Sequence, residues 1–163
     1  MQEVVGYRGK IKYDIQTALA YKDRPPRQQV AEIALVDRVF RWVPKTHRIL
    51  DLPCGGGRVS VHLARNGYQV SCADHSEAML EIARRFLREN RLECPVERQD
   101  IEALTCSNRQ FDTVICFRLF HHFPTPAIRQ RAVAELCRVA GSYVALSYFS
   151  PLSVTSLKRR LRA

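Results

Sequence analysis

The 163-residue sequence has no apolar run near the roughly 18–20 residues that a membrane-spanning helix needs. Its six cysteines form no CxxC pair, and its five histidines complete no zinc pattern with them. The first residues, MQEVVGYRGKIKYD, lack the apolar core of a signal peptide. These absences exclude the collagen-like, mucin-like and integral membrane classes. They also predict no metal site, no integral membrane span and a cytoplasmic location.

The composition is that of one folded domain. Apolar residues make up 46% and charged residues 26% of the chain, a balance typical of globular proteins. A domain of this length needs no disulfide to fold, so we interpret the cysteines as buried free thiols. The net charge of +10 indicates an anionic partner such as nucleic acid, a phosphorylated substrate or a membrane surface. A surface that is merely basic would give the same charge.

Apolar spacing and breaker residues predict strands that alternate with helices. The predicted helices cover residues 28–43, 59–65, 77–90 and 126–139. The predicted strands cover residues 48–52, 68–73, 96–100, 111–117 and 142–148. This order predicts an α/β fold: a Rossmann-like, doubly wound, mostly parallel sheet of about five strands with helices on both faces. Ligands bind beyond the carboxyl ends of such strands, so the residues that follow each strand are the candidates.

The first two strand ends suit a nucleoside-bearing ligand. Asp51 is followed by Leu-Pro-Cys-Gly-Gly-Gly, and glycines let a backbone approach a ligand closely. The helix after this turn offers free N–H groups to an anion. Asp74 ends the second predicted strand, where a carboxylate can accept both hydroxyls of a ribose. Each feature alone is common, as a turn or a helix cap, and their combination favours the ligand.

The residues after the third and fourth predicted strands could bind an adenine ring and a second ligand. Asp100 could accept from an adenine amino group, and Ile101 offers a backbone N–H and an apolar face to the ring. The alternative is that Asp100 only builds a turn. Residues 117–122, Phe-Arg-Leu-Phe-His-His, place a carbonyl, a cation and two imidazoles at the same edge.

Together, the segments ILDLPCGGG, ADHSEAML, RQDI and FDTVICFRLFHHF resemble the class I S-adenosylmethionine-dependent methyltransferases, and most closely their small-molecule, ubiquinone-type branch. The resemblance covers about residues 28–150. It implies an S-adenosyl-L-methionine-binding domain there, an N-terminal lid segment over residues 1–27 and a basic C-terminal tail over residues 151–163. A nicotinamide-binding turn fits less well, because Ser60 stands where its last glycine is needed.

The resemblance also implies roles for single residues. Asp51 would hold the methionine amine of the cofactor, together with the backbone carbonyl of Phe117, and Asp74 would hold the ribose diol. The other implied cofactor-binding residues are Cys54, Gly55 and Gly57 in the loop, His75 and Met79 beside the adenine, and Asp100 and Ile101 at its edge. Met79 could equally pack on the sheet. Pro53 departs from the family pattern, because it replaces a glycine and removes an N–H.

The implied reaction is an in-line displacement that moves a methyl group to a small-molecule acceptor. His121 and His122 are candidate general bases, since imidazole titrates near neutral pH, although either could simply pack or cap the next helix. Arg118 would bind the acceptor if that acceptor is anionic. Tyr13 and Tyr21 lie in the lid segment, and we expect Tyr21 to touch the donor or the acceptor.

Two questions stay open at this stage. The family sheet usually has two more strands than the five predicted here, which leaves the fifth strand as an apolar edge. We favour a truncated chain, and the alternatives are a homodimer through this edge or a natural five-strand variant. The competing functions are a non-catalytic cofactor-binding or scaffold domain, an RNA methyltransferase suggested by the charge, and, more distantly, a dehydrogenase.

Overall fold

The computed structural model describes residues 26–148, so the predicted lid segment with Tyr13 and Tyr21, and the basic tail, lie outside the described residues. The elements follow one another along the chain as α3 (Pro26–Phe40), β1 (Arg48–Asp51), α4 (Arg58–Arg65), β2 (Gln69–Asp74), α5 (Glu77–Glu89), β3 (Val96–Arg98), β4 (Phe111–Cys116), the 3₁₀ helix η2 (Phe120–His122), α6 (Pro126–Val139) and β5 (Ala140–Leu146). None of the helices within these residues is long and apolar enough to cross a membrane.

The strands form one parallel sheet in the order β3-β2-β1-β4-β5. From β1 the chain first adds β2 and β3 on one side, and then returns to add β4 and β5 on the other. The strand order therefore switches between β1 and β4, and a ligand crevice is expected at their carboxyl ends. The predicted α/β, doubly wound fold class is confirmed.

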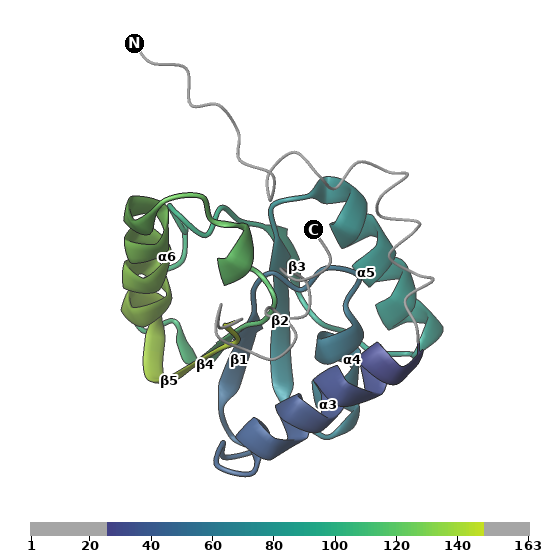
Figure 1. Ribbon diagram of the computed structural model, residues 1–163. Coiled ribbons are helices and arrows are strands. Elements are labelled where there is room, and N and C mark those ends of the chain that lie inside the picture. The colour runs from purple at the N-terminus through teal and green to yellow at the C-terminus, as the bar shows by residue number, and fades with distance from the viewer. Residues whose placement is uncertain (1–25, 149–163) are drawn as a thin grey trace.

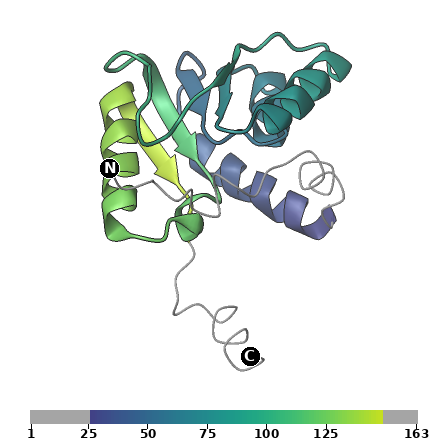
Figure 2. The ribbon, with the colours of Figure 1, turned by 90° about the horizontal axis from the view of Figure 1, so that it is seen from above.

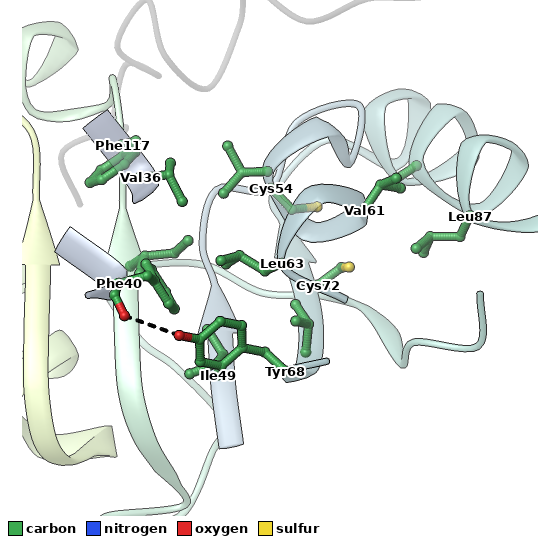
Figure 3. Close-up of a cluster of buried hydrophobic side chains, with 14 of the residues drawn as sticks. Val36, Phe40, Ile49, Cys54, Val61, Leu63, Tyr68, Cys72, Leu87 and Phe117 are labelled. Carbon is green, nitrogen blue, oxygen red and sulfur yellow. Dashed lines mark hydrogen bonds between the residues drawn. The ribbon is translucent and has the colours of Figure 1, made fainter. Parts of the chain in front are cut away.

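Each face of the sheet is covered by helices, so the central strands are buried on both sides. Figures 1 and 2 show α6 on one side and α3, α4 and α5 on the other. Successive residues of a strand point to opposite faces, and neighbouring Ile49 and Leu50 accordingly belong to different core clusters. Figure 3 shows the cluster beneath α3 to α5, which contains Ile49.

The element boundaries follow local hydrogen bonding. Helix α3 ends at Phe40, before the predicted Val43, and the Tyr68 hydroxyl donates to the carbonyl oxygens of Phe40 at 3.0 Å and Val43 at 3.1 Å (Figure 3 draws the first). Strand β3 stops at Arg98, before the predicted residue 100, and the Gln99 side chain accepts from the Thr105 backbone N–H at 3.0 Å, which anchors the turn that follows.

Strand β5 differs most from its prediction. It begins at Ala140, directly after α6, whereas the Ala140-Gly141 pair predicts a turn and a strand over residues 142–148. The reason is register: Ala140 already pairs with Phe111 of β4, and an irregularity between Phe111 and Thr113 absorbs the difference. By contrast, Ser76 caps α5 as predicted, with its Oγ accepting from the Met79 N–H.

Candidate functional site

Two buried carboxylates lie at the carboxyl ends of β1, the central strand of the sheet, and its neighbour β2. Asp51 is 2% exposed, and one of its oxygens accepts a hydrogen bond from the Ser60 hydroxyl of α4 at 2.6 Å. Asp74 is 6% exposed and accepts from the backbone N–H groups of Gly55 and Ser76, both at 2.9 Å. The loop after β1 is thus attached to the end of β2 through Asp74.

Burial makes both carboxylates harder to ionise. It raises the pKa of Asp51 to about 7, against the lowering effect of the Ser60 hydrogen bond. The neighbouring carboxylates of Asp74 and Glu32 add to the rise. Burial also raises the pKa of Asp74, while the N–H bonds from Ser76 and Gly55 oppose the shift. Such a site favours a cation that neutralises the carboxylates.

The glycine turn after β1 adopts left-handed backbone conformations, with φ of +53° at Gly55 and +80° at Gly57. A Cβ atom on Gly57 would lie 3.1 Å from the Cβ of Ala83 and 3.2 Å from its Cα, so the turn packs closely on α5. Gly57 therefore has a packing role that sequence reasoning did not foresee. Gly55 faces the site through its bond to Asp74.

Pro53 leaves the hydrogen bonding of this loop intact. The residues on either side of it still donate to the sheet: Leu52 N–H to the Ile115 carbonyl at 3.0 Å, and Cys54 N–H to the Ala73 carbonyl at 2.8 Å. The side chain of Cys54 lies in the core beneath α4, as Figure 3 shows. Its thiol is therefore buried and has a raised pKa, and a role of Cys54 toward a ligand stays a prediction.

A cavity of about 30 Å³ lies beside Asp51, with Glu32, Arg58 and Phe117 also on its wall. This volume holds about one water-sized group. Phe117 follows β4 directly, and its side chain is 8% exposed and belongs to the core beneath α3. The structure therefore brings Asp51 and Phe117 together at the switch point, as predicted.

Glu32 and Arg58 are members of the site that sequence reasoning missed. The Arg58 Nη1 lies 3.2 Å from a Glu32 carboxylate oxygen, and the two side chains are only 20% and 11% exposed. Two signals could have revealed them. Glu32 shares the four-residue spacing of the buried Val36 and Phe40, which places a carboxylate on an apolar stripe. Arg58 begins α4, where the helix dipole disfavours a cation without a partner.

The residues expected beside the adenine make structural contacts in this arrangement. Met79 is 1% exposed and Ile101 is 5% exposed, the latter packed in the core beneath α6. One Asp100 oxygen accepts from the Glu102 N–H at 3.0 Å, which is the turn-building alternative. The His75 carbonyl accepts from the Arg98 Nε at 3.2 Å. Their roles toward a ligand stay predictions.

The segment after β4 is attached to the rest of the fold through Arg118. Arg118 has a φ of +64°, its N–H donates to the Ser147 hydroxyl at 2.7 Å, and its Nη1 lies 3.8 Å from a Glu32 oxygen. The rings of His121 and His122 in η2 have centroids 3.9 Å apart and are tilted by 43° to each other. Helix α6 starts at Pro126 behind the Thr125 cap, as predicted, so both histidines lie outside it. His121 is exposed and His122 half-buried.

The arginine-rich run on α5 is neutralised in part by its own helix. Arg84 pairs with Glu77 and Glu81, and Arg85 lies 3.8 Å from Glu89. Within residues 26–148, no group of three or more His, Cys, Asp or Glu side chains is placed to hold a metal ion.

Comparisons with known proteins agree with this geometry. A family model described as "Methyltransferase domain" matches residues 49–141. The ubiquinone biosynthesis O-methyltransferase of Coxiella burnetii (strain RSA 493 / Nine Mile phase I) is 34% identical over 97 residues, which is 60% of this chain and 42% of that protein. The enzyme of the same description from Stutzerimonas stutzeri (strain A1501) is 38% identical over 95 residues, or 58% and 41% of the two chains. The chain spans about two fifths of the length of these relatives.

Solved structures share the fold. A Methanosarcina mazei structure described as SAM-dependent methyltransferases superposes with a TM-score of 0.69 at 25% identity, covering 75% of this chain and 61% of that one. The magnesium protoporphyrin IX methyltransferase of Synechocystis PCC 6803, solved with bound SAH, gives 0.65 at 26% identity, covering 83% and 61%. The chain therefore belongs to the methyltransferase domain family, the class I S-adenosylmethionine-dependent methyltransferases that its strand-end motifs resemble.

Proposed function

We propose that this chain binds S-adenosyl-L-methionine at the carboxyl ends of β1, β2 and β4 and transfers its methyl group to a small-molecule acceptor. One observation carries the proposal: two buried carboxylates, Asp51 and Asp74, flank a left-handed glycine turn at the strand-order switch. The neighbour solved with bound SAH supports the cofactor, and the O-methyltransferases named above support an oxygen atom as the methyl acceptor.

The residues at this edge fit the chemical groups of the cofactor. Asp51 and Phe117 line the same cavity, and we propose that the Asp51 carboxylate and the Phe117 carbonyl accept from the methionine ammonium. The two Asp74 oxygens accept the backbone N–H groups of Ser76 and Gly55, one each, and a carboxylate has about four acceptor positions, which suits the two ribose hydroxyls. Met79 and Ile101 are covered by protein, so any contact of theirs with the adenine requires a local rearrangement.

When bound, the cofactor supplies a methyl group on a sulfonium, which is already activated for displacement. The chain then has to position the reactants and exclude water, and positioning can supply roughly 7–11 kcal/mol of a barrier. A general base is needed only if the acceptor arrives protonated. His121 and His122 are proposed for that role, because an imidazole is exposed at the edge where Phe117 lies.

The charge of the acceptor, the partners of the chain and its location are also matters of proposal or prediction. Arg118 is proposed to meet an anionic acceptor, since its side chain remains 31% exposed beside Glu32. The predicted nucleic-acid partner, the homodimer through β5, the lid over residues 1–27 and the cytoplasmic location stay predictions.

A thermal-shift titration with S-adenosylhomocysteine tests the proposal. Ligand at 100 times its Kd adds about 2.7 kcal/mol of stability, which raises the Tm of a domain of this size by roughly 5–11 °C. We expect that rise in the wild type and in Asp112→Asn, whose carboxylate lies at the opposite end of the sheet. Asp74→Asn should lose most of it. A folded wild type without any rise would contradict the proposal.

Turnover separates an enzyme from a scaffold domain. We expect S-adenosylhomocysteine to accumulate when S-adenosyl-L-methionine is supplied with a panel of phenolic acceptors. Binding without product from any acceptor would favour the non-catalytic alternative.

A further inference from the structure

Glu32 lies beside the cavity in which we propose that Asp51 meets the ammonium of the cofactor. Its helix, α3, carries it inward, because Val36 and Phe40 on the same stripe are buried in the core. The Glu32 side chain is 11% exposed and lines the same cavity as Asp51. Its two carboxylate oxygens face different cations, with Arg58 at 3.2 Å and Arg118 at 3.8 Å.

The cavity suits part of an amino-acid group but not the whole of it. A volume of about 30 Å³ accepts one water-sized group, such as an ammonium beside Asp51. The carboxylate of the same ligand needs further room and a cation. Arg58 lines the cavity and begins α4, whose first N–H groups also favour an anion. In this structure, however, Arg58 already forms an ion pair with the Glu32 carboxylate.

We propose that Arg58 recognises the carboxylate of the ligand's amino-acid end, and that Glu32 occupies Arg58 as an internal substitute until the ligand replaces it. The inference rests on the proposed function, since it names residues of the same site. The exchange keeps every charge paired: the ligand carboxylate takes Arg58, and the released Glu32 carboxylate has Arg118 within reach.

The affinity for the ligand is then set by a competition between two carboxylates. A ligand that must displace an internal group binds more weakly. Its apparent Kd equals the intrinsic Kd divided by the fraction of molecules in which the site is open. Removing the charge of Glu32 should therefore tighten the binding of ligands that carry a carboxylate. It should not tighten the binding of ligands that lack one.

The test compares S-adenosylhomocysteine with its decarboxylated analogue, which keeps the amine and the nucleoside. Dissociation constants from isothermal titration calorimetry are measured for the wild type, Glu32→Gln and Arg58→Gln. Asp37→Asn is the matched control, because Asp37 lies on the same helix and pairs with His62 of α4 at 2.6 Å, away from the cavity. Circular dichroism and Tm confirm that each variant is folded, and Glu32→Asp, whose shorter side chain reaches less far, is the second variant if Glu32→Gln does not fold.

We expect Glu32→Gln to bind S-adenosylhomocysteine about tenfold more tightly, within the usual range of couplings between two sites. The decarboxylated analogue should gain nothing. Arg58→Gln should weaken S-adenosylhomocysteine at least tenfold and leave the analogue within about twofold, because only the carboxylate contact is lost. Asp37→Asn should match the wild type for both ligands.

Two results would overturn the inference while the proposed function stands. The first is that Glu32→Gln weakens both ligands, which would make Glu32 a partner of the ammonium. The second is that Arg58→Gln changes both ligands equally. If no folded variant binds either ligand, the proposed function fails and the inference fails with it.

Discussion

Asp51 and Asp112 are aspartates on neighbouring strands, and their surroundings shift their pKa in opposite directions. At the carboxyl end of β1, burial raises the pKa of Asp51 to about 7. At the amino end of β4, hydrogen bonds from the Arg48 side chain and backbone lower the pKa of Asp112 to about 2. The Asp112 oxygens accept from the Arg48 N–H at 2.8 Å, Nε at 3.0 Å and Nη2 at 3.1 Å.

This difference in pKa indicates that the amino end of the sheet has a structural role and the carboxyl end a binding role. The carboxylate at the amino end has its own cation, so its ionisation supports the fold. The carboxylate at the carboxyl end accepts hydrogen bonds from Ser60 but is buried with two other carboxylates nearby, so its ionisation opposes the fold. We infer that a bound cation, the ligand's ammonium, would relieve this cost.

The largest effect is expected from Asp51→Asn. The amide oxygen can still accept from Ser60, while the buried charge is gone. At pH 8 we expect the free energy of unfolding to rise by about 3 kcal/mol, somewhat less than the full pKa shift implies. Urea denaturation of the two proteins at pH 8 measures the difference, and a loss of stability would contradict the account.

The same variant shows a distinct pH dependence. The folded pKa of Asp51 lies above its ordinary value of 3.8, so the native state keeps a proton that the unfolded chain has released. Stability therefore falls as the pH rises from about 4 to about 7, and the loss is complete above that window. Denaturation curves across this range should fall more steeply for the wild type than for Asp51→Asn. Parallel curves would show that Asp51 ionises normally.

Alanine substitutions at Gly57 and Gly67 separate the cost of backbone strain from the cost of crowding. Gly57→Ala places a Cβ 3.1–3.2 Å from Ala83 at a φ of +80°, so we expect a loss of about 2 kcal/mol from strain and crowding together. Gly67→Ala has a similar φ of +84° with nothing within 4 Å, so strain alone should cost about 1 kcal/mol. Chemical denaturation measures both, and equal losses would remove the packing role of Gly57.

Asp112→Asn gives the smallest effect. The pair that it breaks is partly exposed, with the Arg48 and Asp112 side chains 54% and 31% accessible, so solvent screens the attraction. We expect a small decrease in stability at pH 8, opposite in sign to the effect of Asp51→Asn. The stability difference between the wild type and Asp112→Asn should depend on pH only between about 2, the lowered pKa of Asp112, and its ordinary 3.8. It should shrink as the pH falls through this range. A gain in stability would contradict this assignment.

The sequence allowed the order of the elements and the strand-end carboxylates to be predicted, because these follow from periodicity and from short, local motifs. Asp51 and Asp74 were found in this way, each at the end of a buried run. The spacing of Glu32 with the buried Val36 and Phe40 indicates an inward carboxylate, but its place beside Asp51 depends on how α3 packs on the face of the sheet. The start of β5 at Ala140 depends on its register against β4, which no local pattern records.

The adenine-side predictions show the same limit. Met79 and Ile101 are buried, and their availability to a ligand depends on packing between distant elements. The sequence motif places both residues near the correct strand ends but does not say which atoms face the crevice.

The most direct test of the central claim is the affinity for S-adenosylhomocysteine of Asp51→Asn beside Asp112→Asn at pH 8, measured by calorimetry. The account predicts that Asp51→Asn weakens binding at least tenfold, since a charge-assisted contact to the ammonium is worth about 1.5–3 kcal/mol, while Asp112→Asn binds as the wild type does. Equal affinities in both variants, or equal losses, would contradict the division of the sheet into a binding end and a structural end.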